Sequence, residues 1–182
     1  MSIVGMGLRL CIQAWPKILF WALFLSLCSF TTSALAQVWE PARFDQMVRA
    51  AAQAKEGGNK EEAERLCVAT FRYVDMSVIK ALFDYAALLR TLGRPEADVA
   101  QERAEKYREI KTRPVPPQGS SEYLGWSPPD ELKAFAALLG DTGRTDEAKA
   151  IVALAAAQDR VNKAHFVRLI DQRQGRDPRG NC

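Results

Sequence analysis

The chain has 182 residues, with 25 lysine and arginine residues against 22 aspartate and glutamate residues, and a formal net charge of +3. Two basic residues, Arg9 and Lys17, lie in a segment that we expect to be removed, which leaves 25 − 2 = 23 basic against 22 acidic residues. This near balance excludes a strongly basic surface for nucleic acid, and the remaining length is that of one ordinary domain.

The first 36 residues have the features of a signal peptide. They contain no acidic residue, and the apolar run ILFWALFLSLCSF follows Lys17. The run ends in TTSALAQ, where Ala34 and Ala36 supply small side chains, so we expect cleavage after Ala36. The alternative is a membrane anchor over residues 18–36, which is nearly as long as the roughly 20 residues of a membrane-spanning helix. In both cases the rest of the chain would act outside the cytoplasm, as a periplasmic or secreted protein.

Four cysteines limit the disulfides that the chain can form. Cys11 and Cys28 lie in the predicted signal peptide, so Cys67 and Cys182 would remain in the exported part. Lipid attachment at Cys28 is disfavoured because the bulky Leu27 precedes it. Since Cys67 lies in an apolar helical stripe, we expect it to be a small buried hydrophobic side chain. There are two alternatives: a disulfide between Cys67 and Cys182, or a homodimer bridged through Cys182.

Apolar residues recur at helical spacing in three stretches, residues 44–74, 78–110 and 130–157. In each stretch a glycine separates two stripes, and these corner glycines are Gly58, Gly93 and Gly143. Glycine permits the left-handed backbone that ends many helices. A small residue follows each corner and lets two helices approach closely, namely Ala63, Ala97 and Ala148. The pattern therefore predicts three antiparallel helical hairpins.

The corner sequences KEGGNKEEA, AALLRTLGRPEA and GDTGRTDEA resemble those of the tetratricopeptide repeat (TPR) family. Small residues stand seven positions before the corner glycines: Ala51, Ala86 and Ala136. Gly58 and Gly93 are 93 − 58 = 35 residues apart, near the roughly 34-residue TPR period. The repeats are degenerate, because the usual aromatic positions hold other residues: Met47, Leu82, Leu132, Cys67 and Val152. The resemblance implies an all-α solenoid of about three hairpins, although other arrays of helical pairs share this pattern.

The domain organisation follows from these stretches. We expect a linker at residues 37–43, a repeat domain at 44–174 with a capping helix at 159–174, and a disordered tail at 175–182. A proline-rich insertion occupies residues 112–129 and carries Tyr123 and Trp126 in an otherwise polar segment. These two aromatic side chains belong either to a partner-recognition arm or to a connection that fills a gap in the solenoid.

Motifs for catalysis or cofactor binding are absent from the sequence. His165 is the only histidine, which excludes a multi-histidine metal site, and we expect it to be a partly buried structural residue. The glycines at 57–58 lack the following Gly-Lys-Ser/Thr of a phosphate-binding loop. Paired acidic residues lie at helix starts, where they complement the helix dipole. We therefore predict no catalytic residue, metal or cofactor.

The TPR resemblance implies that the first helix of each hairpin lines a concave groove for a protein or peptide. The inward positions would be Asp45, Val48, Ala52, Lys55 and Glu56; Lys80, Phe83, Ala87, Arg90 and Thr91; and Asp130, Lys133, Ala137 and Asp141. Such a groove, basic in its middle, suits an extended segment with acidic and apolar groups. The asparagines of chaperone-tail-binding members are missing from these positions.

The sequence thus predicts an exported adaptor or scaffold that binds a protein partner and not nucleic acid. A membrane would be contacted only through an uncleaved signal segment. The alternatives are a self-associating structural subunit of an envelope assembly and an envelope enzyme that uses acidic residues.

Overall fold

A computed structural model describes residues 39–113 and 127–175 of the chain. Helices make up 86% of these residues, and the described part contains no strand, which confirms the predicted all-α class. The predicted signal peptide with its cleavage site, the aromatic residues Tyr123 and Trp126, and the tail after Gly175 lie outside the described residues. No helix in the described ranges has the length and apolar character needed to cross a membrane.

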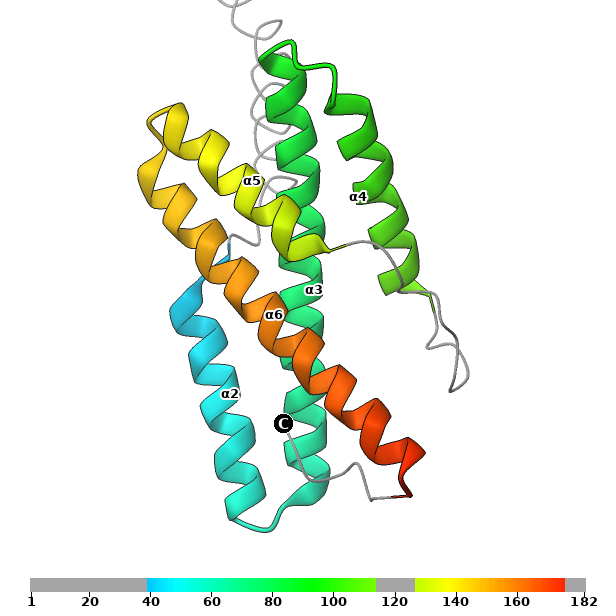
Figure 1. The fold of residues 1–182 in the computed structure, drawn as a ribbon. Helices are drawn as coiled ribbons and strands as arrows, with labels where there is room; N and C mark the ends of the chain where they lie inside the picture. The colour runs from blue at the N-terminus through cyan, green and yellow to red at the C-terminus, as the bar shows by residue number, and fades with distance from the viewer. Residues whose placement is uncertain (1–38, 114–126, 176–182) are drawn as a thin grey trace, which may run out of the picture. The chain divides into compact units, whose positions relative to one another are not determined.

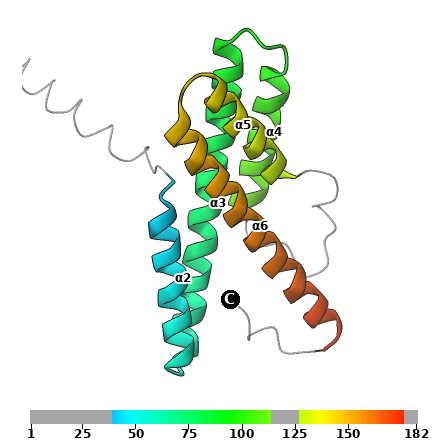
Figure 2. The ribbon, with the colours of Figure 1, turned by 60° about the vertical axis from the view of Figure 1, so that its left-hand side comes forward.

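Five helices follow one another along the described chain. They are α2 (Pro41–Glu56), α3 (Lys60–Thr91), α4 (Ala97–Thr112), α5 (Pro128–Asp141) and α6 (Thr145–Arg173). Three pairs form antiparallel hairpins, namely α2 with α3, α3 with α4, and α5 with α6. In Figures 1 and 2, the hairpin of α5 and α6 lies against α3, which contacts all four other helices.

The three predicted corners form as expected and share one hydrogen-bonding pattern. The corner glycines have left-handed backbones, with φ of +76° at Gly58, +65° at Gly93 and +79° at Gly143. The residue after each glycine donates its N–H to the carbonyl five positions earlier, over 2.8–2.9 Å: Asn59 to Ala54, Arg94 to Leu89, and Arg144 to Leu139. This bond occupies a carbonyl that a helix end otherwise leaves free, and it turns the chain.

The helices between these corners are longer than the sequence analysis predicts. Helix α3 runs through residues 74–78, where the boundary between the first two hairpins was expected. Likewise α6 runs on to Arg173, so the predicted separate cap at residues 159–174 is wrong. The stretches 60–91 and 145–173 contain no glycine or proline, so no residue interrupts the helical hydrogen bonds. The first two hairpins therefore share α3.

The main hydrophobic core surrounds the middle of α3. Val74 and Val78 of α3 are fully buried, as are Leu132 of α5 and Leu154 of α6. A smaller cluster joins α3 to α4 near their corner, through Ala86, Leu89, Ala97 and Ala100. The alanines that precede the three corners by seven residues, Ala51, Ala86 and Ala136, are all buried, as close helix packing requires.

A candidate protein-binding groove

A mainly apolar cavity of about 160 Å³ opens where α2, α3 and α6 meet. Its lining comprises Phe44, Val48 and Ala51 of α2, Cys67, Thr70 and Phe71 of α3, and Arg160, Val161 and Ala164 of α6. We call this cavity the α2/α3/α6 groove. Phe44 and Ala51 are only 4% exposed, whereas Val48 is 39% exposed. The floor is thus packed apolar surface, and the rim is accessible to an apolar group from another molecule.

Arginines lie over the aromatic rings beside this groove. The Arg160 guanidinium carbon is 4.6 Å from the centre of the Phe44 ring, and that of Arg168 is 5.1 Å from the Phe71 ring. A cation at this distance from a ring face is attracted by about 0.5–1 kcal/mol at exposed sites. Among the described residues, no carboxylate forms an ion pair with Arg160. The groove therefore combines an apolar floor with positive charge at its rim.

Cys67 lies in the wall of the groove. Its side chain is buried, as predicted, with 5% of the residue exposed. The residue is also disulfide-bonded, so the expectation of a simple buried hydrophobic side chain is incomplete. Its bonding partner lies outside the described residues.

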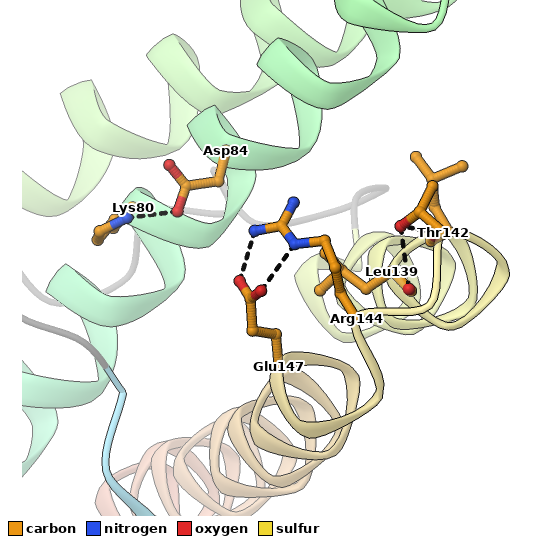
Figure 3. A network of polar contacts seen from close by, with 7 residues as sticks. Lys80, Asp84, Leu139, Thr142, Arg144 and Glu147 are labelled. Carbon is orange, nitrogen blue, oxygen red and sulfur yellow. Dashed lines mark hydrogen bonds and ion pairs between the residues drawn. The ribbon is translucent and has the colours of Figure 1, made fainter.

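Of the predicted partner-binding residues that the structure describes, Val48 lines this groove, and the others are distributed over three helices. Lys80 on α3 forms an ion pair with Asp84 and faces the corner between α5 and α6, as Figure 3 shows. There Arg144 is bonded to Glu147 over 2.7 Å. The Lys80–Asp84 pair of α3 and the Arg144–Glu147 pair of the α5–α6 corner lie near each other in Figure 3, and both are separate from the α2/α3/α6 groove.

The remaining predicted residues lie at other places. Phe83 is half-buried with the Arg108 guanidinium 5.1 Å above its ring, which joins α3 to α4. Arg90 is 3.2 Å from Asp98 across the corner between α3 and α4. Lys133 is 3.2 Å from Asp130 at the start of α5, and Asp45 and Lys55 are exposed on α2.

A polar cluster ties α3 to α4. Asp75 accepts a hydrogen bond from the Tyr107 hydroxyl at 2.9 Å. It also forms an ion pair with the Lys111 ammonium group at 2.9 Å. His165 lies near this cluster, and its pKa is lowered by burial and by the positive charges of Lys111 and Arg168, against the opposing effect of Asp75. Since two donors satisfy the Asp75 carboxylate, the cluster has the chemistry of a structural tie.

A second cavity, of about 260 Å³, lies between α3, α4 and α5 and has a more polar lining. It includes Tyr85, Glu96, Arg103 and Glu131, of which Arg103 and Glu131 form an ion pair. Burial raises the pKa of Tyr85, and the carboxylates of Glu131 and Glu96 add to the effect. Arg103 of this cavity is already paired with Glu131 of the same cavity, which distinguishes it from the α2/α3/α6 groove.

Sequence reasoning missed the α6 side of the groove. The helical spacing of Val161, Ala164 and Arg168 indicates a common face, but not the helices that this face meets. Arg160 lies one position before that face and carried no sequence signal of its own. The groove exists because α6 continues without a break past residue 159 and reaches α2 and α3.

Comparison of the chain with protein-family models, with curated proteins and with solved structures found no match. In the part of the chain that the structure describes, no group of three or more histidine, cysteine or acidic side chains is placed to hold a metal ion.

Proposed function

We propose that this chain is an exported protein-interaction module that binds a peptide segment of its partner in the α2/α3/α6 groove. The observation that carries the proposal is the apolar floor beneath the accessible rim formed by Val48 and Arg160. An apolar side chain of the partner would enter the groove, because burial of apolar surface from both molecules is favourable at about 25 cal/mol per Å². The module acts as an adaptor or scaffold and not as an enzyme.

Arg160 defines the chemistry of the partner segment. A carboxylate beside the apolar side chain of the partner would meet the guanidinium group of Arg160, which offers paired N–H donors to such a group. The predicted partner was an extended segment with acidic and apolar groups, and this groove supports the same chemistry at a different place. The disulfide at Cys67 supports export, because disulfides persist in oxidising compartments such as the periplasm or the cell exterior.

We also propose that the three hairpins derive from a TPR-like solenoid in which the first two units have fused. The three equal corners and the buried alanines before them support this relation. Fusion of α3 removes the angle between the first two units, so the concave surface of separate repeats would be lost. In that case the binding surface lies where α6 crosses α2 and α3.

A displayed library of random dodecapeptides tests the proposal without knowledge of the natural partner. Panning against the full chain, with and without a thiol reductant, is expected to enrich peptides with an apolar residue flanked by Asp or Glu. The groove variant Val48→Asp, Arg160→Glu should lose them. The matched control variant Val152→Asp, Arg94→Glu changes exposed residues outside the groove and should retain them. Equal binding by both variants would refute the groove as the binding site.

A second candidate function is self-association, which a different surface favours. The outer face of the C-terminal part of α6 exposes Phe166 at 64%, Val167 at 43% and Ile170 at 37%. Adjacent exposed apolar side chains are typical of protein contact surfaces. Sedimentation of the full chain under reducing conditions should detect a dimer that Phe166→Ser abolishes. A monomer for both forms would remove this candidate.

A further inference from the structure

We propose that the second cavity, between α3, α4 and α5, binds one alkyl cation, that is, an ammonium or guanidinium group on an aliphatic stem. Tyr85 of α3 and Glu96, the residue before α4, bind the charged group, and Leu89 and Val99 contact the stem. This cavity shares no lining residue with the α2/α3/α6 groove and selects the opposite charge. The inference therefore goes beyond the proposed function and does not depend on it.

The charges in the lining of this cavity do not balance. Two carboxylates, those of Glu96 and Glu131, stand against one guanidinium group, that of Arg103. Arg103 forms an ion pair with Glu131. Among the described residues, no cation forms an ion pair with Glu96. A ligand of charge +1 would compensate this remaining negative charge, because opposite charges attract more strongly in a recess that partly excludes water.

The start of helix α4 does not use the Glu96 carboxylate. Glu96 is the N-cap residue of α4, a position where a side-chain oxygen often accepts an N–H of the first turn. No such side-chain hydrogen bond forms here, although the Glu96 carbonyl accepts the Ala100 N–H at 2.9 Å. The acidic residue of the first turn, Asp98, is paired with Arg90 at 3.2 Å. The Glu96 carboxylate can therefore accept hydrogen bonds from the N–H groups of a ligand.

The Tyr85 hydroxyl gives the cavity a further hydrogen-bonding group. Tyr85 is half-buried, and its ring packs against Phe135 of α5 with 5.7 Å between the ring centres. Within the described ranges of the chain, no residue forms a hydrogen bond with this hydroxyl. Because burial and the nearby carboxylates raise the pKa of Tyr85, the hydroxyl stays protonated at neutral pH. Its oxygen can accept an N–H of the cation, and its proton can be donated to a carboxylate.

The size of the cavity and its apolar lining indicate a small ligand with an aliphatic stem. Its volume of about 260 Å³ lies below the roughly 300–1,000 Å³ of pockets for drug-sized molecules, so it suits a group of side-chain size. Leu89 is buried, whereas Val99 is 53% exposed. A stem that covers Val99 loses apolar surface while its charged end reaches the carboxylate. Lysine and arginine side chains of a protein share this chemistry with free alkylamines.

Titration of the ¹⁵N-labelled full chain with n-pentylamine, a cation on an aliphatic stem at pH 7, tests the site. We expect the largest amide shifts at Tyr85, Leu89, Glu96 and Ala100. Glu96→Gln should raise the Kd about tenfold, through the loss of one charge-assisted hydrogen bond, and Tyr85→Phe should raise it severalfold. The matched control Asp98→Asn removes the same charge from the same helix start, outside the lining, and should leave the Kd unchanged.

Neutral n-pentanol separates recognition of the charge from burial of the stem. It should bind about tenfold more weakly than n-pentylamine. Equal binding of the two molecules would overturn the cation site, and so would an equal loss of n-pentylamine binding in Glu96→Gln and Asp98→Asn. Circular dichroism should show that all three variants fold as the wild type does.

A capped Ala-Lys-Ala tripeptide identifies the source of the cation. Tighter binding of the tripeptide than of n-pentylamine at the same residues would assign the cation to a protein side chain. Tighter binding of n-pentylamine would assign it to a free amine. If neither molecule shifts the amides of Tyr85 and Glu96, the proposal is overturned.

Discussion

The continuity of helix α3 can be tested at Met76, which lies in the middle of α3 and is 47% exposed. Replacement of Met76 by proline removes one helical N–H donor and places the ring against the carbonyl four residues earlier. The cost is about 3 kcal/mol in a helix interior, and because the side chain is exposed little packing energy is added. Met76→Ala, the matched control, retains the helix and should be nearly neutral.

For a domain of this size, about 3 kcal/mol corresponds to a decrease in Tm of roughly 10–15 °C. Thermal and urea unfolding, followed by circular dichroism, measure this difference between the two variants. A turn at residues 74–78, as the repeat pattern predicts, would accept proline. A Met76→Pro protein within about 1 kcal/mol of Met76→Ala would therefore refute the continuous helix.

Three further predictions concern the corners and the polar cluster. Gly143→Ala should destabilise by about 1 kcal/mol through backbone strain alone, because no atom lies within 4 Å of the added Cβ; urea unfolding measures it, and a neutral result would contradict the left-handed corner. Asp75→Asn should lower the free energy of unfolding by about 1–3 kcal/mol, because it removes the carboxylate that forms an ion pair with Lys111. Asp98→Asn, which breaks the exposed pair with Arg90, should lower it much less. His165 has a pKa below its unfolded value, so stability should fall as pH decreases through about 6.5, and His165→Gln should reduce the decrease in Tm between pH 7.5 and 5.5.

The corners could be predicted from sequence because their cause is local. A glycine such as Gly58 or Gly143, with a small residue five positions later, specifies a helix end and a close return by backbone geometry alone. The alanines seven positions before each corner could be predicted in the same way, because a small side chain there lets the two helices of a hairpin approach closely. They are buried in the structure.

The helix ends between the corners could not be predicted by analogy with repeats. No residue between Val74 and Val78 breaks a helix, so the periodic expectation of a boundary had no local support. The groove was missed for a different reason. Val48 and Arg160 are more than one hundred residues apart, and only the crossing of α6 over α2 and α3 brings them to one cavity. Long-range packing of this kind leaves no mark in spacing or composition.

The most direct test of the proposed binding groove is a chemical-shift map of the ¹⁵N-labelled full chain, reduced and titrated with a panned acidic–apolar peptide. We predict that the largest amide shifts cluster at Phe44, Val48, Phe71 and Ala164, which line the α2/α3/α6 groove. Shifts concentrated instead at Tyr85 and Leu89 would place binding in the second cavity and contradict the account.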